Sequence, residues 1–342
     1  MPMTAAAEIA PFDARCVRLI ADLGLGAEVL AVTPLTGGVA SDIARVDLPE
    51  GPVCVKFALP KLKVAADWFA PVHRNRAEYE WLAVAGSVAP SSVPRLLGRS
   101  EALNGFAMEF LQGDTVYLWK AALLAGQAPK GEAALVADVL GRIHARSTEP
   151  GFDPAPFQNR DDFRAIRLEP YLSQTAICHP DLATRFQDLS DRLFQSGTAL
   201  VHGDISPKNI LMRDGVPVIL DAECATMGDP VFDVAFCLNH LVLKSLHLPG
   251  QSAILQREAL DFWRAYARRV TWEAPSDLEA RLVVLLPALM LARVDGKSPV
   301  EYLGDATQQK VRRISRNLIV HPPAALTDLL IRLDERGRSS DF

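Results

Sequence analysis

The sequence predicts an α+β protein with an antiparallel-sheet lobe followed by a mostly helical lobe. Short strand-like runs separated by turn residues occur within residues 29–57 and 93–111, and apolar stripes at helical spacing dominate the region beyond them. At 342 residues the chain is long for a single hydrophobic core and sufficient for two. Gln112-Gly113-Asp114 is a turn signal between the two patterns, so we expect lobes at 1–112 and 113–342.

Composition excludes several classes of protein. The formal net charge of −5 leaves no basic excess for neutralising nucleic-acid phosphates. Five cysteines are scattered without metal-ligand spacing, which indicates free thiols in a reducing compartment. The N-terminus lacks the features of a signal peptide, and no apolar stretch reaches bilayer-spanning length. We therefore expect a cytoplasmic protein that binds neither nucleic acid nor membrane.

The first helix should cover the sheet lobe. Cys16, Leu19, Ile20 and Leu23 repeat at helical spacing, and Gly24 follows as a stop signal.

A glycine-rich turn between two of the predicted strands is a candidate phosphate-binding element. It contains Thr36, Gly37, Gly38 and Ser41. Glycines would let such a turn close over a phosphate with backbone N–H groups as donors. An ordinary hairpin turn is the alternative, because Gly-Gly is common there.

Lys56 stands alone among apolar residues in a predicted strand. Its amine could simply reach water at the edge of the sheet. We favour a cation aimed at nucleotide phosphates and held by a carboxylate on the next helix, predicted from about Asn75 to Ala85. Glu78 and Glu80 lie two positions apart and so point to different faces. We choose Glu78 as the partner of Lys56.

The strongest motif lies between residues 202 and 221. His202, Asp204 and Asn209 have the spacing His-x-Asp-x4-Asn, and Asp221 follows a strand-like run. Arg213-Asp214-Gly215 predicts a hairpin that brings Asn209 and Asp221 together. Mg²⁺ prefers a few protein oxygens completed by phosphates and waters, so these two residues are candidate ligands. Asp204 can accept the proton of an incoming hydroxyl, and the set therefore predicts phosphoryl transfer.

Residues around this motif are further candidates. Lys208 can neutralise charge on a transferred phosphoryl group or lie on the surface. Glu223 reaches the same cavity if the chain stays extended, where it would meet a second metal or a substrate hydroxyl. His202 is interpreted as a structural anchor. Asp229 and Pro230 predict the start of a helix, and Asp233 inside it should accept N–H groups of the 202–209 loop, because its neighbours are apolar.

The remaining segments are predicted to be mostly helical. An apolar stripe through Ile143 should end at His144, and further stripes occur within 259–266, 278–289 and 326–333. Arg164, Arg167 and Tyr171 share a helix face that could meet substrate, although solvated charge is the default interpretation. Residues 293–299 read as a charged loop.

The pieces with the spacing above resemble the aminoglycoside phosphotransferase family of the protein-kinase-like superfamily: His202-Gly203-Asp204, Asn209, Asp221, Glu223, and Gly228-Asp229-Pro230 with Asp233. With Lys56, Glu78 and the glycine-rich turn, the resemblance covers roughly residues 30 to 240. It implies a bilobal protein-kinase-like fold with ATP in the cleft and adenine against the backbone around Met108, Glu109 and Leu111. It also implies Mg²⁺ on Asn209 and Asp221, and Asp204 as the base.

The resemblance leaves the phosphate acceptor open. Lys56-Phe57-Ala58-Leu59-Pro60, Trp68 and Arg76-Ala77-Glu78 are similar to methylthioribose kinases, whereas Ser206-Pro207-Lys208-Asn209 departs from their pattern. We expect a kinase that phosphorylates a hydroxyl of a small metabolite, with a methylthioribose-type sugar as one candidate. An aminoglycoside kinase is the alternative and would need Asp and Glu lining the acceptor side of the cleft. A catalytically silent binding module is a third hypothesis, which the retained Asp204, Asn209, Asp221 and Lys56 disfavour.

Overall fold

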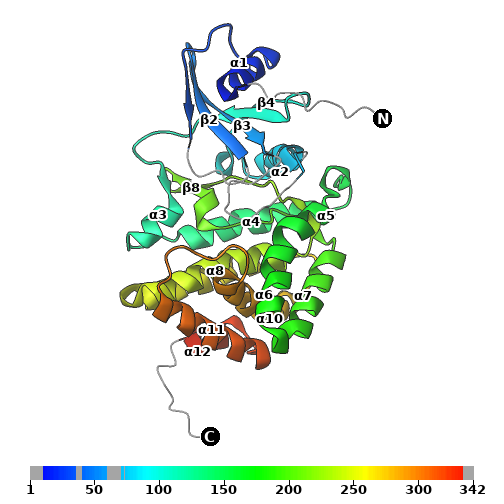
Figure 1. Ribbon diagram of the computed structural model, residues 1–342, viewed down its shortest axis with the longest axis vertical. Helices are drawn as coiled ribbons and strands as arrows, with labels where there is room; N and C mark the ends of the chain where they lie inside the picture. Colours follow the sequence, from blue (N-terminus) through cyan, green and yellow to red (C-terminus); the bar gives the residue numbers. More distant parts are fainter. Residues whose placement is uncertain (1–10, 36–40, 60–70, 73, 334–342) are drawn as a thin grey trace, which may run out of the picture.

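The computed structural model describes residues 11–35, 41–59, 71–72 and 74–333. A five-stranded antiparallel sheet, in the order β1-β2-β3-β5-β4, forms one end of the molecule, and helices make up most of the rest (Figure 1). The strands are β1 Ala31–Pro34, β2 Ser41–Leu48, β3 Gly51–Ala58, β4 Leu96–Ser100 and β5 Gly105–Glu109. This arrangement confirms the predicted α+β class.

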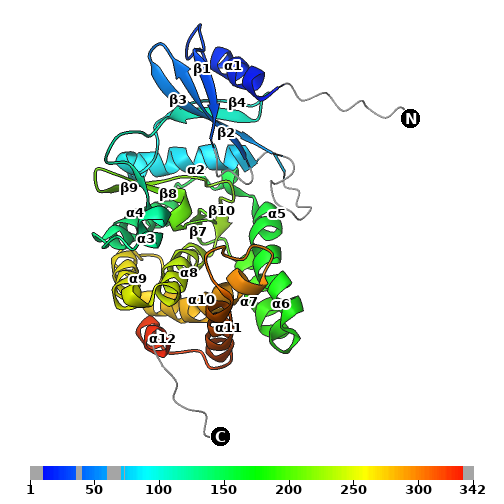
Figure 2. The ribbon, with the colours of Figure 1, turned by 60° about the vertical axis from the view of Figure 1, so that its left-hand side comes forward.

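Two helices cover opposite faces of the sheet. α1 (Phe12–Asp22) packs on the outer face, and α2 (Arg74–Val88) lies between the sheet and the helical region (Figure 2). Side chains alternate along β3, so Val55 and Phe57 join the cluster under α1, whereas Cys54 belongs to the cluster that contains α2. The same alternation puts Lys56 on the side of α2.

The helical region is built from ten α-helices among the described residues, with short strands between some of them. The helices are α3 Trp119–Leu124, α4 Glu132–Thr148, α5 Arg160–Phe163, α6 Gln174–Cys178, α7 Ala183–Gln195, α8 Val231–His247, α9 Ser252–Ala267, α10 Pro275–Asp295, α11 Asp305–Val320 and α12 Leu326–Leu333. The strands are β6 Tyr117–Leu118, β7 Ala199–Val201, β8 Ile210–Arg213, β9 Val216–Ile219 and β10 Thr226–Gly228. Wide π-helical turns occupy Arg164–Ser173.

Several predicted boundaries are wrong by a turn or less. α4 continues past His144 to Thr148, and residues 293–295 belong to α10 instead of a loop. α8 begins at Val231, and the Asp229 carboxylate accepts the Val231 N–H at 3.1 Å. The amphipathic helix α11 was not predicted. Its surface is rich in polar residues, so its apolar stripe is short.

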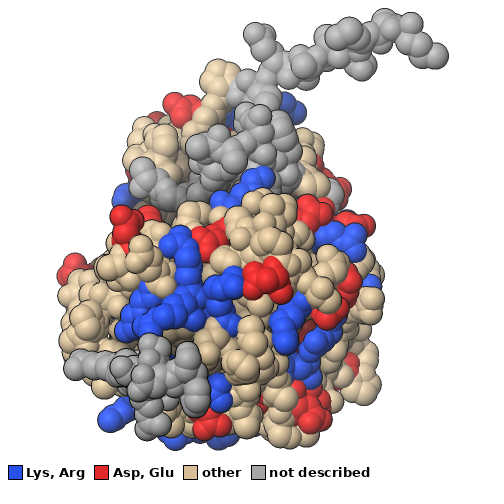
Figure 3. Space-filling view, turned by 60° about the horizontal axis from the view of Figure 1, so that its bottom comes forward, with Lys and Arg blue, Asp and Glu red and all other residues tan. Residues whose placement is uncertain are grey.

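Charge is distributed unevenly over the surface. Figure 3 shows Lys and Arg side chains gathered on one face of the helical region, although the whole chain carries a formal charge of −5. No single helix in the described part of the chain has both the length and the apolar character to cross a membrane. One pair, Val231–His247 with Pro249–Ala267, meets that test together by length and composition alone, and the pair is bent by 117°.

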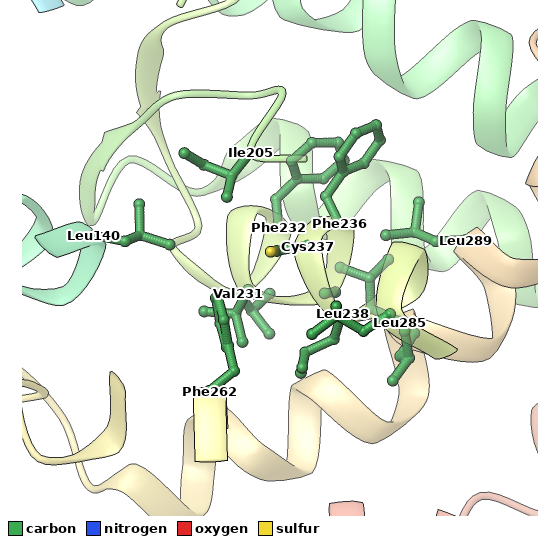
Figure 4. Packing of buried hydrophobic residues seen from close by; sticks show 14 of the residues in the cluster. Leu140, Ile205, Val231, Phe232, Phe236, Cys237, Leu238, Phe262, Leu285 and Leu289 are labelled. Atoms are coloured by element: carbon green, nitrogen blue, oxygen red, sulfur yellow. The ribbon is translucent and has the colours of Figure 1, made fainter. Parts of the chain in front are cut away.

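The helix α8 forms the centre of the helical core. Every residue from Val231 to Leu246 is buried, because α8 packs against both α9 and α10. In Figure 4, Phe232 and Phe236 point toward Ile205, while Val231 and Leu238 lie on the side of α9 and α10. The loop that contains Ile205 therefore rests directly on the most buried helix of the protein.

Candidate active site

The β8–β9 hairpin brings two oxygen-bearing side chains together. Ile210 pairs with Ile219, and the Leu220 N–H donates to the Asn209 carbonyl at 2.9 Å. The next residue, Asp221, has a left-handed backbone with φ of 70°, which an aspartate adopts at some cost. The Asn209 side-chain N–H donates to the Asp204 carbonyl at 3.0 Å, so its amide oxygen is left for another partner. Asp204, Asn209 and Asp221 thus converge as the spacing predicts.

Lys56 connects this group of residues to the sheet. Its side chain is almost fully buried, and Nζ lies 2.7 Å from Glu78 Oε2. The same ammonium bonds the Asp221 carboxylate. The expected Lys56–Glu78 ion pair is therefore present, whereas Glu80 is half-buried elsewhere on α2.

The Glu78 and Asp221 carboxylates share the Lys56 ammonium, and this arrangement sets the protonation state of all three groups. Burial acts to lower the pKa of Lys56, but Asp221 and Glu78 outweigh burial and raise it. Burial acts to raise the pKa of Asp221, but the Lys56 ammonium holds it well below the usual range. Burial dominates at Glu78 and raises its pKa to about 7 despite Lys56. Asp221 is therefore the firmly ionised carboxylate of the pair.

Asp204 lies buried between two cations. Its Oδ2 is 2.9 Å from Arg167 Nη2 and 3.0 Å from Lys208 Nζ. Burial acts to raise the pKa of Asp204, but Lys208 and Arg167 outweigh it and keep this pKa below the ordinary value. Its Oδ1 is buried and has no hydrogen-bond partner among the described residues. That oxygen is ionised and available to a hydroxyl proton.

Arg167 is the functional neighbour that sequence reasoning missed. Its default interpretation as solvated charge is wrong, because its side chain is buried, pairs with Asp204 and donates to the Gly203 carbonyl. The sequence offered one weak signal: Arg167 shares a helix face with Tyr171, which is also buried.

Asp233 fixes the backbone of the 202–209 loop, as predicted. Its two oxygens accept the His202 N–H at 2.6 Å and the Gly203 N–H at 2.8 Å. His144 Nε2 lies 3.2 Å from the same carboxylate, so the residue predicted to end α4 supports the loop anchor. Gly203 has φ of 78°, and a Cβ there would lie 2.7 Å from Cys224 Cβ, so this turn requires glycine.

His202 is an anchor and not a base. Its Nδ1 accepts the Asp204 N–H at 3.1 Å, which assigns the ring proton to Nε2, and Nε2 then donates to the Leu220 carbonyl at 3.1 Å. Burial lowers the pKa of His202, so the ring is neutral. Both ring nitrogens are occupied, and neither faces a substrate.

Glu223 differs from its prediction. The chain turns after Asp221 instead of staying extended, and Glu223 Oε2 accepts the Arg74 Nε–H at 3.0 Å. Arg74, the first residue of α2, thereby joins the sheet side of the molecule to the turn after β9. Because the segment after Asp221 is not an extended strand, the alternation that was expected to direct Glu223 into the cavity is absent.

A cavity of about 310 Å³ is lined by part of this site, and the 202–209 loop reaches it through Lys208 and Asn209. Its polar end contains Lys56, Glu78, Lys208, Asn209 and Asp221, and its other walls are largely apolar. The predicted adenine-binding residues Met108, Glu109 and Leu111 line it too. Thr36, Gly37 and Gly38 lie outside the described residues, and Ser41 opens β2 as a buried residue.

The lining of this cavity fits a nucleotide and a divalent cation. An apolar slot that ends in two lysines and two oxygen ligands matches a base followed by metal-bound phosphates. Clusters of three or more His, Cys, Asp or Glu that could hold a metal do not occur among the described residues. A set of Asn209 and Asp221 is sufficient where phosphates complete the octahedron.

Solved structures of similar shape show which fold this is. A choline/ethanolamine kinase family protein from Mesorhizobium loti matches with a TM-score of 0.54 and 15% identity, covering 94% of this chain and 98% of that one. An amicoumacin kinase in complex with AMP-PNP, Ca²⁺ and Ami matches with a TM-score of 0.57 and 13% identity, covering 93% of this chain and 98% of that one. At these identities the likeness shows the fold alone, and the predicted kinase-like fold is confirmed.

The relatives found by sequence have a different name from these structural neighbours. Methylthioribose kinases of Erwinia tasmaniensis and Cronobacter sakazakii are 26% and 27% identical to this chain. The matches cover 61% and 64% of this chain, and they span 58% and 63% of those relatives. A family model described as "Phosphotransferase enzyme family" matches residues 31–278, which include every described residue of the site above. The chain belongs to the phosphotransferase enzyme family.

Proposed function

We propose that the protein is an ATP- and Mg²⁺-dependent kinase that phosphorylates a hydroxyl of a small metabolite. One observation carries this proposal: the ionised Asp204 has an unpartnered oxygen, and its loop also contributes to the cavity that contains Lys56, Asn209 and Asp221. These are the groups that phosphoryl transfer requires.

Each residue has a defined task in the proposed reaction. The acceptor hydroxyl donates its proton to Asp204 Oδ1 while its oxygen forms a bond to the γ-phosphorus, and the bond from that phosphorus to ADP breaks. Lys56 binds the nucleotide phosphates, and Lys208 neutralises charge on the transferred group. Asn209 and Asp221 would hold Mg²⁺, which would supply neutralisation of the phosphate charge. Asp204 contributes mainly by orienting the hydroxyl, because the transition state is loose.

The nucleotide is assigned to the cavity between two lobes, 1–112 and 113–342. Adenine lies against the backbone near Met108, Glu109 and Leu111, which line the apolar part of the cavity. Thr36, Gly37, Gly38 and Ser41 are assigned to the phosphates. A sugar of methylthioribose type is the first acceptor to try, since relatives at 26–27% identity are named methylthioribose kinases.

The substitution Asp204→Ala tests this assignment. We expect turnover, followed as ADP release with pentoses, methylthioribose, amino alcohols and aminoglycosides, to fall by roughly two to four orders of magnitude. Nucleotide binding, measured by calorimetry with AMP-PNP and Mg²⁺, should remain. Asp188→Ala, on the exposed face of α7, is the matched control and should keep full activity. Loss of nucleotide binding in Asp204→Ala would contradict the role given to this residue.

A further inference from the structure

Helix α8 carries a row of side chains, two of them polar, that the proposed phosphoryl transfer does not use. Phe236, His240 and Lys244 are spaced four residues apart and so share one face of the helix. Lys244 has no exposed surface, and His240 is 5% exposed. Arg293, on the neighbouring helix α10, is 8% exposed. Buried cations are costly and call for an explanation.

These buried cations lack carboxylate partners. Lys244 faces the ring of Tyr302, with Nζ 4.8 Å from the ring centre. Arg293 Nη1 donates to the Tyr171 hydroxyl at 3.1 Å and to the Ser298 carbonyl at 2.6 Å. All three partners are uncharged. Within the described ranges neither Lys244 nor Arg293 forms a salt bridge, whereas Lys120 nearby is paired with Glu301.

The same region contains buried polar atoms that no described residue satisfies. They are His240 Nε2, Arg293 Nε and the Tyr302 hydroxyl. Each such atom costs on the order of 1–3 kcal/mol unless something bonds it. Cations and unpaired donors together form a site of positive potential that lacks its negative charge.

This group of residues begins close to the reacting hydroxyl. Arg167 pairs with Asp204, and Tyr171 lies one helical turn further on and contacts Arg293. The ring of Phe236 lies 5.5 Å from both the Tyr171 and the His240 rings, measured between centres. Successive contacts through Arg167 and Tyr171 therefore connect Asp204 to this group.

We propose that the phosphate acceptor is an anionic alcohol whose carboxylate or phosphate group binds Lys244 and Arg293 while its hydroxyl faces Asp204. Arginine and lysine together favour a carboxylate or phosphate, to which they donate charge-assisted hydrogen bonds. This proposal rests on the proposed kinase function and replaces its first candidate acceptor, a neutral sugar of methylthioribose type, with an anionic class. A sugar acid or a sugar phosphate meets it, whereas a polycationic aminoglycoside would be repelled.

The protonation of Lys244 agrees with a missing anion. Burial, followed by Lys120, lowers the pKa of Lys244 to about 7, with Arg293 adding to the effect and Glu301 opposing it. A bound anion would restore the charge on Lys244.

Anion binding can be measured without knowing the acceptor. The full-length protein is saturated with AMP-PNP and Mg²⁺, which fills the nucleotide site, and then titrated with inorganic phosphate or acetate at constant ionic strength. We expect saturable heat of binding and a rise in melting temperature with one of these anions, and none with chloride. The responding anion identifies phosphate or carboxylate as the group recognised. No response to either anion overturns the proposal.

Two variants locate the response. Lys244→Met keeps the length of the side chain and removes its charge, so the apparent dissociation constant should rise about tenfold to a hundredfold. Lys120→Met, at the partly exposed edge of the group, provides a second measurement of anion binding if Lys244→Met folds poorly. We expect it to weaken binding by a smaller factor. Lys310→Met, on the exposed face of α11, is the matched control and should bind like wild type. Equal binding in all of them would mean an adventitious ion only.

Paired alcohols then separate this inference from the kinase proposal. Glycerate is compared with glycerol, and ribose 5-phosphate with ribose and methylthioribose, each as a competitor of the bound anion. We expect the charged member of a pair to compete and the neutral member not to. Competition by neutral alcohols alone refutes the acceptor class and leaves the kinase proposal standing. Failure of the protein to bind AMP-PNP with Mg²⁺ would instead refute the proposed kinase.

Discussion

Asp204 holds its charge because of residues that come from two separate segments. Lys208 follows it in the same loop, whereas Arg167 reaches it from the π-helical segment. With both cations in place the carboxylate stays ionised, and only one of its oxygens is engaged by them. Orientation and charge of the proposed base are thus set by different parts of the chain.

Asp221 should control the metal dependence of nucleotide binding. We expect Asp221→Asn to weaken binding of AMP-PNP in the presence of Mg²⁺ by about tenfold or more, because a neutral oxygen is a poorer magnesium ligand. Calorimetry with and without Mg²⁺ measures this. Binding without metal should change less, and an unaltered metal dependence would contradict the ligand assignment.

Lys244 should make folding stability depend on pH. The folded-state pKa is about 7 and the ordinary value is 10.5, so between these values the unfolded chain binds more protons than the folded chain. Stability attributable to Lys244 must therefore rise with pH across this window, by a few kcal/mol at most. The ionisable groups near it are Lys120, Glu301, Arg293, Cys237, Tyr302 and His240.

Urea unfolding between pH 7 and 10 checks this dependence. Wild type should gain stability relative to Lys244→Met as pH rises, whereas Lys310→Met should follow wild type. Parallel curves for wild type and Lys244→Met would show that Lys244 is charged in the folded protein throughout.

At the level of elements, one helix organises the site. α8 is buried along nearly its full length, and its first turn supplies the carboxylate that bonds the 202–209 loop. Three residues further along, at Phe236, begins the row that leads to Lys244. The same central helix therefore positions both the 202–209 loop and the proposed acceptor site.

Asp233→Asn should disturb the position of the 202–209 loop on α8. One of its two oxygens becomes an NH₂ group that cannot accept a loop N–H, so we expect a loss of roughly 1.5–3 kcal/mol of unfolding free energy. Turnover should fall further than nucleotide affinity, because Asp204 is misplaced. Chemical unfolding and steady-state kinetics measure the two effects. Asp261→Asn, in an exposed ion pair on α9, should change neither by much. Equal losses in both variants would exclude an anchoring role.

At the level of the whole molecule, two buried ion pairs join the sheet region to the helical region. Lys56 of β3 bonds Asp221, and Arg74 of α2 bonds Glu223. Both carboxylates come from the short segment after β9. The relative position of the two regions is thus coupled to the residue proposed to bind the metal.

A double-mutant cycle tests the second of these pairs. Arg74→Met and Glu223→Gln should each weaken AMP-PNP binding and stability, and together should do little more than either alone. The coupling energy should be on the order of 1–3 kcal/mol, since both side chains are buried. Strictly additive effects would show that this ion pair does not couple the two regions.

Local patterns were sufficient to predict much of this molecule. A lone lysine in an apolar strand indicated the pairing of Lys56 with Glu78, the turn signal at 213–215 brought Asn209 to Asp221, and the apolar neighbours of Asp233 indicated a buried carboxylate. Each of these inferences depends on spacing within one or two elements. Arg167, Arg74 and His144 were missed or misread, because their partners lie 37, 149 and 89 positions away.

The sequence by itself determined the order of strands and helices, the spacing of the phosphoryl-transfer residues and the family to which they point, because these are properties of neighbouring residues. Tertiary structure alone decided which charges are neutralised. Lys208 and Arg167 share one carboxylate, Lys56 bridges two, and Lys244 and Arg293 have none among the described residues. Charge balance depends on which charged side chains lie close together in space, and the order of residues along the chain does not specify this.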